Sequence, residues 1–120
     1  MKPSIDGTEF GNITISGNVY EHDVVIRLGG KIEKRKKKLS KAKYGTSHKI
    51  SLEEVENIFE AGAERLIIGT GQYGQVELSN KAADFIQQNG CQVQMFPTPQ
   101  AVTAWNGADG AVIGMFHVTC

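Results

Sequence analysis

Two short segments of the chain carry side chains that could bind a ligand. The first, with sequence YGTSH, spans residues 44–48 and joins a phenol, two hydroxyls and an imidazole just before a predicted helix. Unpaired backbone N–H groups at the start of a helix favour an anion, so Tyr44, Ser47 and His48 are candidate ligand-binding residues. The alternative is a structural loop whose hydroxyls bond to backbone groups.

The second segment is the glycine-rich run GTGQYG at residues 69–74, which directly follows a predicted buried strand. It matches G-x-G-x-x-G, but a dinucleotide site also needs the last glycine inside a starting helix and an acidic residue after the next strand. Neither is present, so no cofactor is expected. Open α/β sheets nevertheless bind ligands at such strand ends, whereas the structural alternative is that the glycines only allow positive φ and close packing. The candidate ligand-binding residues of this loop are Gly69, Thr70, Gly71, Tyr73 and Gly74.

Other reactive side chains do not form a recognisable catalytic or metal site. His117 and Cys120 are three residues apart, which in a strand places them on opposite faces and argues against a nucleophilic pair. His117 shares a face with Ile113 and Met115, as is typical of a buried histidine with a hydrogen-bond partner. The cysteines, Cys91 and Cys120, are expected to be thiols. HExxH, paired CxxC, GxSxG and P-loop patterns are absent, so neither catalytic nor metal-ligating residues are predicted.

The charges of the chain are segregated. The 120 residues carry 13 Lys+Arg and 13 Asp+Glu, yet residues 31–49 hold nine basic side chains and one acidic one, a local charge of +8 against −8 elsewhere. A short footprint beside an acidic remainder argues against nucleic-acid binding. An acidic protein partner or a homo-oligomer fits better, the alternative being a solvated arm that complements a Glu-rich helix. The candidate interaction residues are Arg35, Lys36, Lys37, Lys38, Lys41 and Lys43.

Hydrophobic periodicity predicts the elements that must position these residues. The N-terminal third predicts a hairpin: a strand around Ile13 and Ile15, a turn at Gly17-Asn18, and a strand through about Leu28 that is covered on both faces. After a turn at residues 29–30, the basic segment is expected to form a short charged strand or arm.

The rest of the chain alternates helices with strands. The first helix is expected to begin at Ser51, which forms a capping box with Glu54, and to end at Gly62. A buried strand at residues 66–68, a helix over 79–90, a strand over 91–96, a helix that Thr98 caps, and a last strand over 111–118 follow. This order predicts an α/β domain in which helices pack on a mixed sheet.

Length and apolar content limit the remaining possibilities. A chain of 120 residues is close to one domain, so residues 1–120 are expected to form a single domain. The apolar runs are far shorter than the ~20 residues that a membrane span needs. The polar N-terminus does not resemble a signal peptide, so a cytoplasmic location without membrane contact is expected.

Five segments together resemble a widespread family of small domains of unknown function. They are YEHDVVIR (20–27), LSKAKYGTSHKIS (39–51), LIIGTGQYG (66–74), PTPQAV (97–102) and HVTC (117–120). The family includes the adipogenesis-associated domain protein and mitochondrial respiratory complex I assembly factor 3. The resemblance implies a three-layer α/β fold around a mixed sheet and no established enzyme activity. It maps the family's shared patches onto Asp23, residues 44–48 and the 69–74 loop.

The leading functional hypothesis is therefore a non-enzymatic cytoplasmic module for protein interaction or assembly. The alternative is a small-molecule or anion-binding domain, possibly an enzyme, that uses the GTGQYG loop with the YGTSH segment. Nucleic-acid binding by the basic segment is the third hypothesis.

Overall fold

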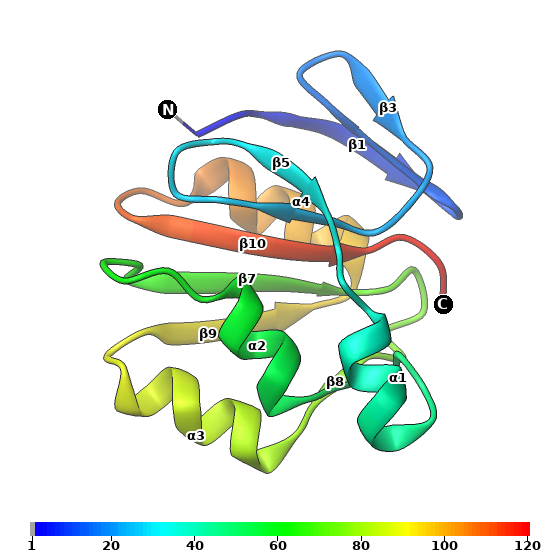
Figure 1. Cartoon of the computed structure of the whole chain (residues 1–120). Coiled ribbons are helices and arrows are strands. Elements are labelled where there is room, and N and C mark those ends of the chain that lie inside the picture. Colours follow the sequence, from blue (N-terminus) through cyan, green and yellow to red (C-terminus); the bar gives the residue numbers. More distant parts are fainter. Residues whose placement is uncertain (1) are drawn as a thin grey trace.

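A five-stranded mixed sheet forms the middle layer of the protein in a computed structural model that describes residues 2–120 (Figure 1). The strand order is β5-β4-β10-β7-β9, with β7 parallel to both β9 and β10, and β4 antiparallel to β10 and β5. The bounds are β4 Val24–Ile26, β5 Ile32–Lys34, β7 Arg65–Thr70, β9 Gln92–Phe96 and β10 Val112–His117. The parallel strands follow from the helical crossovers that connect them.

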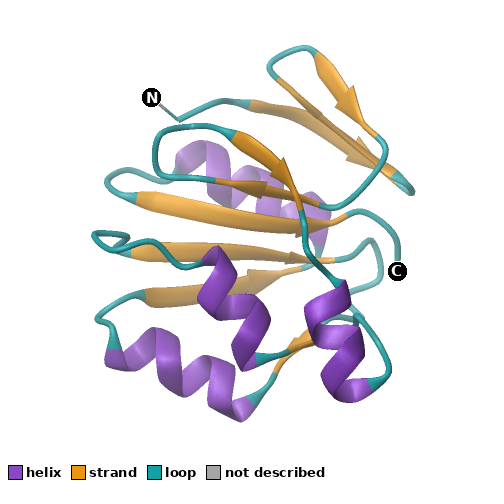
Figure 2. Ribbon diagram, in the orientation of Figure 1, coloured by secondary structure: helices purple, strands orange, loops and turns teal. Residues whose placement is uncertain are grey.

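The two faces of this sheet are covered differently, which makes three layers (Figure 2). Helices α2 (Leu52–Ile58) and α3 (Asn80–Gln88) cover one face. Helix α4 (Thr98–Gly107) and a small antiparallel sheet cover the other, this sheet consisting of β1 (Ile5–Glu9), β2 (Asn12–Ile15) and β3 (Asn18–Tyr20). Helix α1 (Lys38–Tyr44) lies beside α2, and β6 (Lys49–Ile50) pairs in parallel with β8 (Glu77–Leu78). The predicted α/β class with a mixed sheet and packed helices is confirmed.

Strand β7 shows why the sheet needs a cover on both faces. Leu66 and Ile68 belong to the core under α2 and α3, whereas Ile67 between them belongs to the core under α4. All three side chains are fully buried. Successive strand residues point to opposite faces, so an unbroken apolar run requires a layer on each side. The same alternation in β4 confirms that this strand is covered on both faces.

The serine caps predicted for two helices are confirmed, but the predicted end of the first of these helices is wrong. The Ser51 hydroxyl accepts from the Glu54 N–H at 3.1 Å, and the Ser79 hydroxyl accepts from the Ala82 N–H at 3.2 Å. The predicted end at Gly62 is wrong: α2 stops at Ile58, and Phe59 is already extended. Phe59 turns toward α3, where its ring meets Phe85 edge-on at 5.7 Å between centroids. Tertiary packing therefore ended the helix earlier than its glycine would have.

Thr98 is not the N-cap of α4, as predicted, because Pro97 occupies that position. The buried Thr98 hydroxyl donates to the carbonyl of His117 at 2.6 Å and accepts from the N–H of Gly71 at 2.9 Å. The Thr98 hydroxyl is thus engaged by residues distant in the sequence and does not accept from an N–H group of the first turn of α4, as an N-cap would. The helix therefore begins one residue earlier than its local pattern predicts.

The N-terminal third differs from its prediction in four places. Strand β1 was missed, and the hairpin turn lies at Ser16-Gly17, both with positive φ, one residue before the predicted Gly17-Asn18. The predicted strand through Leu28 is split into β3 and β4, which belong to different sheets. The basic segment contains the expected short strand, β5, but it also contains helix α1, which was not predicted. Among residues 2–120, no helix combines the length and the apolar character that crossing a membrane requires.

We expect Ile67→Ala to lower the free energy of unfolding by about 3 kcal/mol, because it opens a cavity between the interior strand β7 and α4. Val19→Ala is the matched control, since Val19 is 61% exposed on β3 and should change stability by less than about 0.5 kcal/mol. Urea denaturation followed by circular dichroism measures both. Equal effects of the two variants would contradict this account of the core.

Candidate functional site

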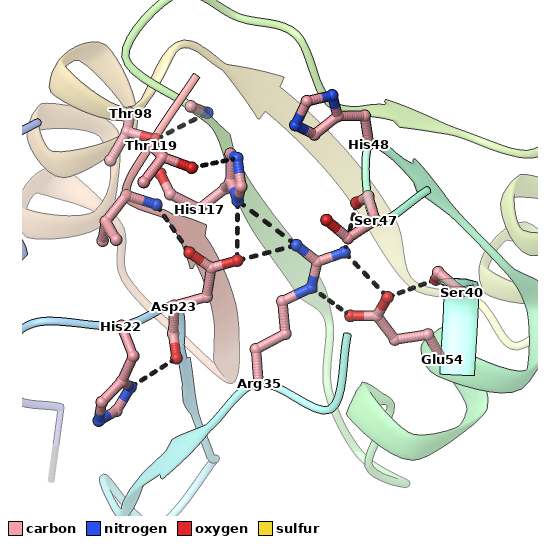
Figure 3. A network of polar contacts seen from close by, with 12 residues as sticks. His22, Asp23, Arg35, Ser40, Ser47, His48, Glu54, Thr98, His117 and Thr119 are labelled. Atoms are coloured by element: carbon pink, nitrogen blue, oxygen red, sulfur yellow. Dashed lines mark hydrogen bonds and ion pairs between the residues drawn. The ribbon is translucent and has the colours of Figure 1, made fainter. Parts of the chain in front are cut away.

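A buried ionic network lies where the middle sheet meets α1 and α2, with the Arg35 guanidinium at its centre (Figure 3). Arg35 Nη1 donates to Asp23 Oδ2 at 2.9 Å. Its Nε donates to Glu54 Oε2 at 2.6 Å, and its Nη2 donates both to Glu54 Oε1 at 3.0 Å and to the Ser47 carbonyl at 2.8 Å. The side chains of Arg35 and Glu54 are 0% exposed. One cation thus links two carboxylates and a loop in a region without solvent.

The members of this network come from elements that are distant in the sequence. Asp23 precedes β4, Arg35 follows β5, Glu54 lies in the first turn of α2, and His117 ends β10. Helix α1 joins through Ser40, whose hydroxyl donates to Glu54 and accepts from the Ser51 N–H. The network therefore fixes the basic segment, at Arg35 and again at Ser40, against the sheet and α2.

Asp23 is held in its ionised form. Burial alone would raise the pKa of Asp23, but the His117 imidazole, the Val118 N–H and Arg35 together lower it from 3.8 to about 2. His117 Nδ1 lies 2.7 Å from Asp23 Oδ2, and the Val118 N–H donates to Oδ1 at 2.9 Å. The prediction that His117 is a buried histidine with a hydrogen-bond partner is confirmed. For Arg35, burial lowers the pKa, but Glu54 and Asp23 outweigh that effect and raise it.

The predicted ligand loop at 69–74 holds the last residues of the chain. The Gln72 N–H donates to the Thr119 carbonyl at 2.6 Å, and the Gln75 N–H donates to the Cys120 carbonyl at 3.1 Å. Gly71, at φ +104°, leaves room for the C-terminal residue Cys120, because a Cβ atom at position 71 would lie 2.4 Å from the Cys120 oxygen. A glycine is required here by both its φ and the close approach. The N–H groups of Gln72 and Gln75, which could have bound an anion, are thus used inside the protein.

The predicted YGTSH segment approaches the same place. The His48 carbonyl accepts from the Glu77 N–H at 2.7 Å, and the His48 ring meets the His117 ring edge-on at 5.4 Å between centroids. His48 Nε2 also lies 3.8 Å from Cys120 Sγ, a pair that sequence spacing did not indicate. Ser47 faces Arg35 through its carbonyl. His48, Ser47 and Gly71 are therefore brought together around His117.

Of the remaining predicted ligand residues, Thr70 lies opposite His117 in the pairing of β7 with β10, whereas the tyrosines point elsewhere. Tyr44 lies under the Lys49 ammonium, 4.9 Å from the ring centroid, while Tyr73 is 70% exposed and faces Phe10. Gly69 and Thr70 belong to strand β7, and Gly74 closes a turn by donating to the Gly71 carbonyl. A hollow of about 280 Å³ is lined by residues of β1 and β2.

A second hollow, of about 500 Å³, lies in the basic segment. It is lined by Lys34, Arg35, Lys36, Lys37 and Lys38. We use "the basic surface" for the six exposed lysines of residues 34–43, the first four of which line this hollow: Lys34, Lys36, Lys37, Lys38, Lys41 and Lys43. Within the described residues 2–120, none of these six forms an ion pair.

The prediction that Arg35 is an interaction residue is wrong, because Arg35 is only 3% exposed. Its charge instead complements Glu54 of α2 within the same molecule. For this residue, the alternative that the segment complements a Glu-rich helix is therefore confirmed. A signal was present in the sequence: Arg35 is the one arginine in the run KRKKK. Arginine can bind carboxylates in a bidentate way and is favoured in buried ion pairs, whereas lysine is a strongly hydrated point charge.

The described part of the chain, residues 2–120, holds no group of three or more His, Cys, Asp or Glu side chains placed to bind a metal ion.

A family model described as "Protein of unknown function (DUF498/DUF598)" matches residues 5–111. The chain belongs to this family. A conserved hypothetical protein from Pyrococcus horikoshii is 34% identical over 98% of this chain and 99% of its own, with a TM-score of 0.91. The protein MT938 is 31% identical over 99% and 100% of the two chains, with a TM-score of 0.84. These relatives confirm the expected membership in a family of small domains of unknown function.

A more distant structure shows the fold alone. An Mth938-like domain from Bordetella pertussis is 15% identical over 97% of this chain and 85% of its own, with a TM-score of 0.69. The three-layer arrangement is thus kept where most side chains differ.

We expect Arg35→Met to lower the free energy of unfolding by about 3 to 5 kcal/mol, because it leaves Asp23 and Glu54 buried without their cation. Lys37→Met is the matched control: it removes the same charge from an exposed position two residues away and should cost less than about 0.5 kcal/mol. Urea denaturation at neutral pH measures both variants. A loss from Arg35→Met no larger than that from the control would contradict a structural role for the network.

Stability should also depend on pH through Asp23. The pKa of Asp23 is about 2 in the folded protein and 3.8 ordinarily, so its contribution, about 2 kcal/mol, is present above pH 4 and is lost as the pH falls from 4 toward 2. The free energy of unfolding, measured by urea denaturation across this range, should therefore fall more steeply for the native protein than for Asp23→Asn. Parallel pH profiles of the two proteins would show that Asp23 does not carry this dependence.

Proposed function

We propose that this protein is a non-enzymatic, cytoplasmic interaction or assembly module that binds an acidic segment of a partner protein through the basic surface. One observation carries the proposal: residues 34–43 hold six exposed lysines, four of which line a hollow of about 500 Å³, and no ion pair within residues 2–120 neutralises them. Clustered like charges repel one another, and an anionic partner relieves that repulsion.

The way the basic surface is held supports recognition of a defined partner. Arg35 and Ser40 tie the segment to Glu54 from both sides of the lysines at 36–38. A segment that is already ordered loses less conformational entropy when it binds. The basic surface is therefore better suited to a specific acidic partner than a mobile lysine-rich tail would be.

Two other observations narrow the class of partner. The rest of the chain carries a charge of −8, which disfavours long polyanions such as nucleic acids. The resemblance to the adipogenesis-associated domain protein and to complex I assembly factor 3 also favours a role in protein assembly. A second copy of this chain is a possible partner within the proposal, because its body is acidic.

The alternative function, ligand binding by the GTGQYG loop with the YGTSH segment, has less support. The N–H groups of Gly71, Gln72 and Gln75 already donate to other residues of this chain. A bound anion would have to displace those hydrogen bonds, and with them the end of the chain.

The proposal is tested with a fluorescein-labelled nonaglutamate peptide, whose binding is followed by fluorescence anisotropy. We expect Lys37→Glu to weaken binding about fivefold or more, because it replaces an attraction by a repulsion at the basic surface. Lys81→Glu is the matched control, since Lys81 is an exposed lysine on α3 and its reversal changes the net charge equally. Raising the salt concentration should weaken binding to the native protein.

Three results would count against this function: no binding of the peptide at low salt, no dependence on salt, or equal weakening by Lys37→Glu and Lys81→Glu. The last result would mean that only the net charge of the protein matters.

A further inference from the structure

The hollow in the basic surface has an unusual lining for an anion site. Five consecutive residues, 34–38, form it, and most of its lining is carbon. Lysine and arginine stems are apolar, and their charged ends extend toward water. Its volume of about 500 Å³ lies within the range of small-molecule pockets and exceeds what an isolated carboxylate needs.

Arg35 contributes to this lining without contributing charge. Its guanidinium is turned away into the protein, where Asp23, Glu54 and the Ser47 carbonyl bind it (Figure 3). Its side chain is 0% exposed. The free positive charge near the hollow therefore belongs to the four exposed lysines that line it, Lys34, Lys36, Lys37 and Lys38.

An apolar hollow surrounded by ammonium groups is complementary to an amphipathic ligand. On the basis of the proposed function, we infer that the acidic segment carries a large apolar side chain, such as that of tryptophan, which inserts into the hollow of residues 34–38. Carboxylates on either side of this anchor bind the lysine ammonium groups. Two interactions favour the binding of an aromatic ring here: the burial of its apolar surface against the lysine stems and the attraction of its face to the ammonium groups.

This arrangement disfavours the other anionic ligands. A polyphosphate concentrates its charge at its centre and would meet carbon there, because the Arg35 guanidinium is not available to it. A single-stranded nucleic acid could stack a base in the hollow, but its backbone would then follow the acidic body of the protein. A short peptide is small enough to contact the basic surface alone.

The test compares two fluorescein-labelled peptides, EEEEWEEEE and EEEEAEEEE, with the intact protein at low salt, about 25 mM NaCl. We expect the tryptophan peptide to bind about tenfold more tightly, because the ring loses apolar surface to the hollow while both peptides keep eight carboxylates. This comparison needs no variant protein, so it does not depend on whether a variant folds.

Two variants then separate the stems from the charges. Replacing Lys36, Lys37 and Lys38 together by Met keeps the apolar stems and removes the charges, so both peptides should bind more weakly while the tryptophan peptide keeps its advantage. Replacing the same three residues by Ala removes the stems as well, and the advantage should disappear. Circular dichroism verifies that both variants are folded.

Equal affinity of the two peptides for the native protein would overturn the apolar anchor and leave the proposed function intact. If neither peptide binds, and nonaglutamate does not bind either, both the apolar anchor and the proposed function are overturned. Tighter binding of oligothymidylate or tripolyphosphate than of the tryptophan peptide would replace the acidic segment with another class of ligand.

Discussion

The fold depends on a single buried cation that two carboxylates share. Arg35 lies without solvent between Asp23 and Glu54, and removing two carboxylates from water is costly unless a cation and hydrogen bonds compensate. Here the compensation is complete within residues 2–120: no buried side-chain nitrogen or oxygen lacks a partner. The network therefore stabilises the arrangement in which the turn before β4, the end of β5 and the first turn of α2 meet.

Features that depend on neighbouring residues could be predicted from the sequence. The caps at Ser51 and Ser79 are formed within one helical turn, and the apolar run at 66–68 already implies a strand with a layer on each side. Predictions failed where a distant contact decided the outcome. Thr98 is a residue type that commonly caps helices, but its hydroxyl bonds to Gly71 and His117 instead. The end of α2 is set by the packing of Phe59 on α3.

The candidate site shows the same limit more sharply. The glycine-rich run at 69–74 follows a buried strand, where α/β sheets bind ligands, and only the arrival of Thr119 and Cys120 shows that the Gln72 and Gln75 N–H groups are used internally. The sequence could likewise locate the basic segment, but it could not separate the buried Arg35 from the exposed lysines. That separation depends on the positions of Asp23 and Glu54, which bind Arg35. The resemblance identified a family of small domains of unknown function, whereas the exposed lysines around the hollow became a defined surface only in three dimensions.

The run KRKKK places two kinds of positive charge on adjacent residues. Arg35 can serve two carboxylates and a carbonyl at once because its planar group carries five N–H donors, and a lysine at that position would leave some of these acceptors unpaired. Lysines 36–38 need not satisfy any buried group, so their strongly hydrated ammonium ions remain in water. The buried cation thus orders the exposed ones: the network that stabilises the core also holds the lysines where a partner could meet them as a group. The net charge of zero therefore conceals six exposed lysines that no ion pair neutralises within the described residues.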